Sequence, residues 1–448
     1  MQSKKISRRN LLKLVGAGSA TLALAACAPA APGTSSDGAG AAPGEAGLDM
    51  TIATFAAELH EWQREFASRW AEENSDVNLQ IEEVVYGEMN KLQLARQASG
   101  TLWDLVFSGI KWFPFSASKG MFLALDDHLA TRDDANLDDF FETALEGGKL
   151  DGSLYGLPYE IHPGNPALVA LNLDLLEAAG VEPPTDDWNV NDYSGLAGQL
   201  ADPDNNVFGT NYLPGNYYDF ESLSRAYGHD LMDPERKQFM ITDEINSEAA
   251  RWLTSLRTDL NAAPPRTEVG TEGIDFISGV FGTAVTGSYS VNGWTQQIGD
   301  NFNVDWVLFP LGPEGHRGYT AFTSNFSVSA ATADPDKAVD LLIYLSTTEA
   351  GLWSALEQGT GQPNARKSVW QDETLLSESH PIFERVLNKL YLADVQGPFP
   401  MPFNLRHPEL QDNWANTSPD LFYGELPFEE GLQAVQDACQ EIMDLPRA

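Results

Sequence analysis

The order of apolar segments in residues 48–109 constrains the fold of this chain most strongly. Three strand-like apolar runs occur there, at 50–56, 78–86 and 103–109. Between the first two runs, Trp62, Phe66 and Trp70 recur at helical spacing, and the second gap is also helix-like. This β-α-β-α-β order predicts a parallel sheet with helices on its faces. The spacing of Trp62 and Trp70 predicts that both belong to the core.

The same alternation continues along the rest of the chain. Strands are expected at 167–172, 282–289, 303–310 and 326–330, and helices at 173–180, 247–260, 347–359 and around Cys439. Asp334 and Pro335 have the chemistry of an N-cap followed by the first residue of a helix. Two blocks of this kind predict two α/β lobes, in which ligands bind beyond the carboxyl ends of the strands, in a cleft. We expect lobe 1 to comprise 48–158 and about 310–360, and lobe 2 to comprise about 159–309 and 361–448.

The first 47 residues are expected to lie outside the fold. Arg8 and Arg9 resemble the twin-arginine export signal, and the apolar residues 14–26 end in a lipobox, LAAC, at Cys27. This apolar run is shorter than the ~20 residues that a transmembrane anchor needs. We therefore predict a signal peptide at 1–26, lipidation of Cys27, and a flexible Gly/Pro/Ala-rich tether at 27–47.

Charge and cysteine content exclude several classes of protein. The formal net charge is −38, which repels nucleic acid, so we expect no DNA or RNA partner. Only Cys27 and Cys439 are present, which excludes a disulfide framework, and Cys439 is expected to be a buried structural residue. No later segment approaches transmembrane length without charges, and no Cys/His cluster has metal-ligand spacing. We expect neither a metal nor a cofactor.

Several collinear motifs resemble the extracellular solute-binding proteins of ABC importers, in the carbohydrate-binding group. They are GTLWDLVFSGIKWFPFSASKGMFLALDD at 100–127, DGSLYGLPYEIHPGNPALVALNLDLLEAAGVEPPTDDW at 151–188, GVFGTAVTGSY at 279–289, the helix pair at 326–363 and GELPFEEGLQAVQDA at 424–438. The resemblance implies the periplasmic-binding-protein type II fold, with two α/β lobes, a hinge and an interlobe ligand cleft. It also implies a monomer outside the cytoplasm, held to the membrane by its lipid, that delivers a mono- or oligosaccharide to the ABC permease.

The resemblance further implies a set of ligand-facing residues. The candidates are Glu58, Ser108, Lys111, Trp112, Tyr159, Glu160, Asn165, Tyr217, Tyr218, Tyr289, Trp294, Asn404 and Arg406. Aromatic rings among them would stack on the apolar faces of a sugar, and the polar groups would satisfy its hydroxyls.

Structural alternatives exist for several of these candidates. A loop aromatic such as Trp112 or Tyr289 can also cap a core. Lys111 and Arg406 could balance the acidic surface, and Glu58 fits the first turn of a helix. The segment 155–159 resembles the first crossing between lobes, which would make Glu160 and His162 hinge-side residues.

Two other functions compete with sugar binding. The same fold could bind a polyol phosphate, a polyamine or iron, and the Tyr217–Tyr218 pair makes iron worth testing. A secreted glycoside hydrolase would need two carboxylates facing each other across a cleft. The chain lacks an eightfold βα series and the common hydrolase motifs, so we expect it not to be an enzyme.

Overall fold

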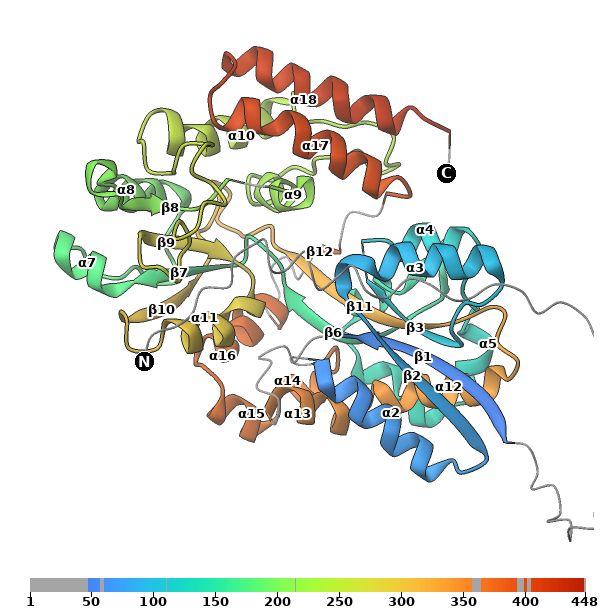
Figure 1. Ribbon diagram of the computed structural model, residues 1–448. Coiled ribbons are helices and arrows are strands. Elements are labelled where there is room, and N and C mark those ends of the chain that lie inside the picture. Colours follow the sequence, from blue (N-terminus) through green and yellow to red (C-terminus); the bar gives the residue numbers. More distant parts are fainter. Residues whose placement is uncertain are drawn as a thin grey trace, which may run out of the picture. The chain divides into compact units, whose positions relative to one another are not determined.

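The computed structural model describes residues 47–56, 60–109, 111–213, 215–356, 364–392, 399–400 and 404–446. The predicted signal peptide, the lipidation site at Cys27 and the tether up to residue 46 lie outside the described residues. The described residues form two α/β lobes, each built on its own sheet (Figure 1). This arrangement confirms the predicted fold class.

The first lobe is built on a six-stranded sheet with the order β12-β11-β3-β1-β2, in which β6 also pairs with β11. Its strands are β1 (Leu48–Phe55), β2 (Val77–Val84), β3 (Leu105–Gly109), β6 (Leu157–Pro163), β11 (Thr320–Val328) and β12 (Phe399–Pro400). As predicted, β1 runs parallel to β2 and β3. Strand β11 runs antiparallel to β3 and β6, so the sheet is mixed.

Helices cover both faces of this first sheet. Figure 1 shows α3 (Tyr86–Ser99) and α4 (Phe113–Ser118) on one side of the sheet, and α2 (Glu61–Glu73) and α12 (Pro335–Leu345) on the other. Trp62 and Trp70 of α2 are buried, which confirms that they are core residues.

The second lobe is built on a four-stranded sheet with the order β10-β7-β9-β8. Its strands are β7 (Leu168–Asn172), β8 (Phe208–Thr210), β9 (Phe281–Thr286) and β10 (Val304–Leu308). Its helices are α7 (Leu173–Ala179), α8 (Val190–Leu200), α9 (Tyr217–Ala226), α10 (Glu244–Thr258), α11 (Val291–Ile298), α17 (His407–Phe422) and α18 (Phe428–Met443). A core of buried aromatic residues, with Tyr193 and Trp414 among them, packs between this sheet and α8, α9, α10 and α17.

Shorter elements complete the described chain. They are the hairpin β4 (Lys149–Leu150) and β5 (Ser153–Leu154), and the helices α5 (Asp126–Leu129), α6 (Glu142–Glu146), α13 (Thr348–Leu356), α14 (Lys367–Trp370), α15 (Glu373–Glu378) and α16 (Ile382–Val386). Among the helices of the described residues, none is long and apolar enough to cross a bilayer.

Local sequence signals explain where particular helices begin and pack. The side chain of Asp334 accepts a hydrogen bond from the backbone N–H of Lys337 at 3.0 Å, so α12 has the predicted N-cap with Pro335 as its first residue. Cys439 on α18 is wholly buried, and burial raises the pKa of its thiol to about 12. This confirms its structural role.

The chain passes between the lobes later than the sequence predicts. Strand β6 pairs with β11 from Leu157 to Pro163, with one bulge, and therefore stays in the first sheet. The passage to β7 occurs at 164–167, so the predicted crossing at 155–159 is wrong. The return passage, residues 309–319, joins β10 to β11. The residue limits of the two lobes given above stay a prediction.

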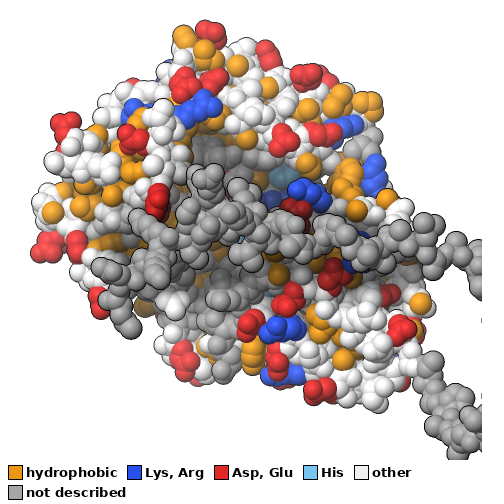
Figure 2. All heavy atoms as spheres, viewed as in Figure 1, with side chains coloured by type: hydrophobic (Ala, Val, Ile, Leu, Met, Phe, Trp, Pro, Cys, Tyr) orange, Lys and Arg blue, Asp and Glu red, His pale blue; other side chains and the backbone are white. Residues whose placement is uncertain are grey.

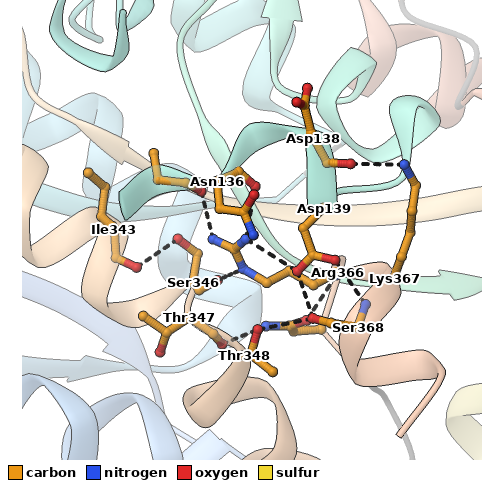
Figure 3. Close-up of polar contacts among 12 residues, drawn as sticks. Asn136, Asp138, Asp139, Ile343, Ser346, Thr347, Thr348, Arg366, Lys367 and Ser368 are labelled. Atoms are coloured by element: carbon orange, nitrogen blue, oxygen red, sulfur yellow. Dashed lines mark hydrogen bonds and ion pairs between the residues drawn. The ribbon is translucent and has the colours of Figure 1, made fainter. Parts of the chain in front are cut away.

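A buried arginine ties together segments of the first lobe that are distant in the sequence. The guanidinium of Arg366 donates hydrogen bonds to the backbone oxygens of Ser346, Asn136 and Ala135, and its Nη1 lies 3.5 Å from a carboxylate oxygen of Asp139 (Figure 3). These bonds join the C-terminal end of α12 to two short turns and to the start of α14. Arg366 thus supplies hydrogen bonds to backbone carbonyls, two of which, those of Ala135 and Ser346, belong to buried residues.

Candidate functional site

A cavity of about 450 Å³ lies where side chains of both lobes meet. Its lining comprises Phe55, His60, Phe107, Lys111, Tyr159, Glu160, His162, Asn165, Asn216, Tyr218, Asp219, Tyr289, Phe322 and Ser324. In the first lobe they come from strands of the sheet and from His60 and Lys111, which follow β1 and β3. The others come from the crossing at 164–167, from α9 with its N-cap Asn216, and from the turn after β9. The cavity therefore combines aromatic surfaces with hydrogen-bonding groups.

The pairing of β6 with β11 sets one wall of the cavity. Glu160 lies opposite Ser324, and His162 lies opposite Phe322. The register then shifts between Ser324 and Asn325, so that Tyr159 has no residue opposite it. Such a bulge re-aims side chains, and here two consecutive residues, Tyr159 and Glu160, both line the cavity.

The crossing between the lobes passes close to the same wall. A Cβ atom added at Gly164 would lie 1.9 Å from Cδ2 of Phe322, so only glycine lets the chain pass over this ring. The Phe322 ring stacks on the imidazole of His162, with centroids 5.7 Å apart, and meets Tyr218 of the second lobe at 5.5 Å. Phe322 is thus packed between the lobes.

Residues near the carboxyl ends of parallel strands form the second wall. Phe55 ends β1, and its ring stacks on Phe107 of β3 with a centroid separation of 6.1 Å. Lys111 follows β3, and its Nζ lies 5.2 Å from the ring centroid of Tyr218 in the other lobe. This position matches the expectation that ligands bind beyond the strand ends.

The second lobe contributes the start of α9 and Tyr289. Asp219, in the first turn of α9, accepts a hydrogen bond from Nδ2 of Asn216 at 2.8 Å. Tyr289 lies in the turn Ser288–Ser290 after β9 and is 42% exposed. Its ring meets His162 edge to face at 5.7 Å. Tyr289 is therefore the cavity aromatic most available to a solute.

Burial controls the protonation of the cavity groups. It raises the pKa of Glu160 to about 7, partly offset by a hydrogen bond from Ser324. Burial also raises the pKa of Asp219 to about 7. Hydrogen bonds from Asn216 and Asn165 and the charge of Lys111 lower this pKa and partly offset the effect of burial. These two carboxyl groups therefore change charge near neutral pH.

The basic groups of the cavity shift in the opposite direction. Burial lowers the pKa of Lys111, and the charge of Asp219 partly offsets this effect. Burial lowers the pKa of both His60 and His162 to about 4, so both imidazoles are neutral at pH 7. The Nδ1 atoms of both imidazoles and Oδ1 of Asn165 are buried without a hydrogen-bond partner.

The structure brings six of the predicted candidates together in this cavity. They are Lys111, Tyr159, Glu160, Asn165, Tyr218 and Tyr289. His162, which the sequence indicated as a hinge-side residue, lines the cavity as well.

Other candidates lie outside the cavity lining and have structural contacts. Ser108 is buried in β3, with its Oγ 2.7 Å from Oγ of Ser327. The ring of Trp112 packs against Phe107 at 6.0 Å, and the hydroxyl of Tyr217 lies 2.7 Å from Nδ1 of His407. Trp294 packs between aromatic residues of the second lobe.

Asn404 and Arg406 line a different cavity, of about 580 Å³. There the guanidinium of Arg406 donates to Glu409 at 2.9 Å, and the side chain of Asn404 accepts from the backbone of Arg406 at 2.7 Å. Glu58 lies outside the described residues.

Sequence reasoning missed several residues that line the cavity. They are Phe55, His60, Phe107, Asn216, Asp219, Phe322 and Ser324. Phe55 and Phe107 belong to runs predicted as strands, and their positions near the strand ends were a usable signal. Phe322 and Ser324 were missed because the strand at 326–330 was predicted to begin too late.

Comparisons with known proteins agree with this architecture. Residues 65–383 match the family described as bacterial extracellular solute-binding protein. A search of curated protein sequences returned no match.

Solved structures with a similar fold cover most of the chain. An ABC substrate-binding protein from Listeria monocytogenes in complex with cycloalternan has a TM-score of 0.76 at 20% identity, covering 89% of this chain and 100% of that one. The GacH receptor of Streptomyces glaucescens, whose structures include an acarbose complex, has a TM-score of 0.73 at 21% identity, covering 89% and 99%. A cyclic alpha-maltosyl-1,6-maltose binding protein from Arthrobacter globiformis has a TM-score of 0.74 at 17% identity, also covering 89% and 99%. At these identities the similarity shows the fold.

Proposed function

Because the chain belongs to the bacterial extracellular solute-binding proteins, we propose that it captures a sugar for an ABC importer. The sugar, a mono- or oligosaccharide, would bind in the cavity lined by both lobes and then pass to the membrane permease. Three structural relatives described above are named for, or were solved with, saccharides or acarbose, which supports this choice of solute.

The composition of the cavity lining carries the proposal. A sugar presents apolar C–H faces and rims of hydroxyl groups. Tyr289 and Phe322 offer ring surfaces, while Asn165, His162 and Lys111 offer hydrogen-bonding atoms. A hydroxyl that bonds these buried groups relieves atoms that otherwise have no partner, and this is the usual source of selectivity.

The contacts across the lobes indicate how binding would favour one conformation. Lys111 and Phe322 of the first lobe meet Tyr218 of the second lobe at the cavity. A solute that bonds both lobes makes more contacts when the lobes are together than when they are apart. It therefore stabilises the arrangement in which these contacts form. The crossings at 164–167 and 309–319 would absorb the movement.

We further propose that the protein works outside the cytoplasm as a monomer anchored by a lipid on Cys27. The order of charged region, apolar region and lipobox supports the anchor. The family is extracellular, which supports the location. Mass spectrometry of the membrane fraction would detect the diacylglyceryl group on Cys27, and a Cys27→Ala variant would be released from the membrane.

The protein is proposed to bind its solute without converting it. Two carboxyl groups, Glu160 and Asp219, line the cavity, and glycoside hydrolases also use two carboxyl groups. The relation to solute-binding proteins favours binding alone. Incubation with oligosaccharides is expected to leave them intact on chromatography, and the appearance of shorter products would show that the protein is a hydrolase.

A thermal-shift screen tests the proposed function. The purified mature protein would be heated with sugars, polyols, polyol phosphates, polyamines and metal ions, each in separate wells. A specific solute raises the unfolding midpoint because it binds only the folded state. We expect the largest shift with a saccharide. If a polyamine, a polyol phosphate or iron raises the midpoint and no saccharide does, the proposed solute would be that compound and not a sugar.

The exposed ring of Tyr289 supplies a test of the stacking surface. Tyr289→Ala is expected to weaken saccharide binding about 5- to 30-fold, because lost ring contact costs about 1–2 kcal/mol. Tyr289→Phe keeps the ring and serves as the matched control, with an affinity within a few-fold of the wild type. Isothermal titration calorimetry measures both. Equal affinities of the alanine variant and the wild type would remove Tyr289 from the site.

A further inference from the structure

The charged groups of the cavity do not balance one another. Two carboxyl groups line it, on Glu160 and Asp219, and they are only 8% and 3% exposed. Among the described residues of the lining, Lys111 is the one lysine or arginine, and burial holds His60 and His162 neutral at pH 7. The lining thus has one carboxyl group more than it has cations.

Glu160 is the carboxyl group of the lining that lacks a positively charged partner among the described residues. Lys111 lies close enough to Asp219 for their charges to act on each other. Asp219 also accepts from the side-chain amide of Asn216 at 2.8 Å. In contrast, the polar partner of Glu160 is the neutral hydroxyl of Ser324, opposite it on β11. No lysine or arginine of the described chain is paired with Glu160.

A buried carboxylate without a cation is costly, since water no longer solvates its charge. The raised pKa of Glu160 reports this cost. A sugar hydroxyl would return one hydrogen bond but no charge. A protonated amine would return both, and a charge-assisted hydrogen bond is about twice as strong as a neutral one.

We propose that the solute is an amino sugar whose ammonium group bonds Glu160, while its remaining hydroxyls bond the neutral groups of the cavity. This inference rests on the proposed sugar-binding function and narrows its substrate class. In the same cavity lining, Nδ1 of His162, on the same strand as Glu160, and Oδ1 of Asn165, on the crossing, are buried without a hydrogen-bond partner. These groups suit the hydroxyls of a sugar ring, which an aliphatic polyamine lacks.

The surface charge of the protein favours the same class of solute. The chain carries a formal net charge of −38, and Figure 2 shows carboxylate side chains spread over the visible face. A negative potential of this kind raises the local concentration of cations and speeds their association. It offers no such gain to a neutral sugar.

Three-member ligand series test this inference by calorimetry. Each series comprises a sugar, its 2-amino derivative and its 2-acetamido derivative. One series is prepared for each of the gluco, galacto and manno configurations, and one for β-1,4-linked glucose disaccharides. The acetamido member has a substituent at the same carbon but no charge. In the series that binds, the amine is expected to bind at least about tenfold tighter than both neutral members.

Substitution of Glu160 assigns the preference to that carboxyl group. Glu160→Gln keeps the shape and removes the charge, and we expect the amine-to-neutral affinity ratio to fall by at least about fivefold. Glu441→Gln, at an exposed position of α18, makes the same change of net charge elsewhere and should keep the wild-type ratio. Folding of Glu160→Gln is checked at about pH 8, where the variant should be at least as stable as the wild type. The sign follows from the raised pKa of Glu160, whose burial costs stability as the pH rises through about 7.

The outcomes separate the inference from the function. Equal or tighter binding of the neutral members would overturn the amino-sugar inference and leave sugar binding intact. An unchanged ratio in Glu160→Gln would overturn the assigned contact. Binding of putrescine or spermidine, with no saccharide bound in any series, would overturn both the inference and the proposed function.

Discussion

Replacing Arg366 by methionine is expected to lower the free energy of unfolding by about 3–5 kcal/mol. The side chain of Arg366 is 3% exposed and donates to three backbone carbonyls from two parts of the first lobe (Figure 3). Methionine fills a similar volume but donates nothing. The variant would then remove a buried partner from the carbonyl oxygens of Ala135, Asn136 and Ser346 and from the carboxylate of Asp139.

Urea unfolding, followed by tryptophan fluorescence and circular dichroism, measures this loss. The neighbouring Lys367 makes one hydrogen bond, from its Nζ to the backbone oxygen of Asp138 at 3.0 Å, near the surface. Lys367→Met removes a positive charge from the adjacent position and is expected to cost less than about 1 kcal/mol. Equal losses in the two variants would show that the Arg366 contacts do not hold the first lobe together.

Filling the cavity is expected to abolish solute binding while the fold is kept. Ser324 lies on β11 with its side chain in the cavity, opposite Glu160. In Ser324→Phe, the added ring would occupy the space proposed for the solute. We expect the affinity to fall by about 100-fold or more, because overlap with a ring costs about 3 kcal/mol or more.

The control for this variant makes the same chemical change away from the cavity. Ser377 is exposed on α15, and Ser377→Phe should bind like the wild type. Both variants should retain the circular dichroism spectrum and a cooperative unfolding transition. Wild-type affinity in a folded Ser324→Phe variant would mean that the solute binds at another place.

Local patterns in the sequence were sufficient to predict much of the fold. The β-α-β-α-β order at the start of the chain depends on hydrophobic periodicity, and β1, α2, β2, α3 and β3 follow it. The cap of α12 is equally local, since Asp334 bonds a backbone N–H three residues later. Such local signals predict the structure correctly where few distant contacts favour another conformation.

The candidate site was harder to predict because distant pairings create it. Residues 155–159, which overlap the start of β6, were interpreted as a crossing. The prolines and glycines nearby hide a strand that pairs with residues more than 150 positions later. The bulge opposite Ser324, which turns both Tyr159 and Glu160 toward the cavity, depends on that pairing. Tyr217 and Tyr218 were both predicted to face the ligand, but they begin α9, and Tyr217 is buried in the core. Family resemblance proposed both tyrosines as ligand-facing, whereas tertiary packing places Tyr218 in the cavity lining and Tyr217 outside it.

The central claim is that a saccharide binds in the cavity lined by both lobes. A crystal structure of the mature protein with the saccharide that gives the largest thermal shift tests this claim most directly. We predict a sugar in contact with Tyr289 of the second lobe and with Phe322 and Ser324 of the first. A sugar bound elsewhere, for example in the cavity lined by Asn404 and Arg406, would contradict the account.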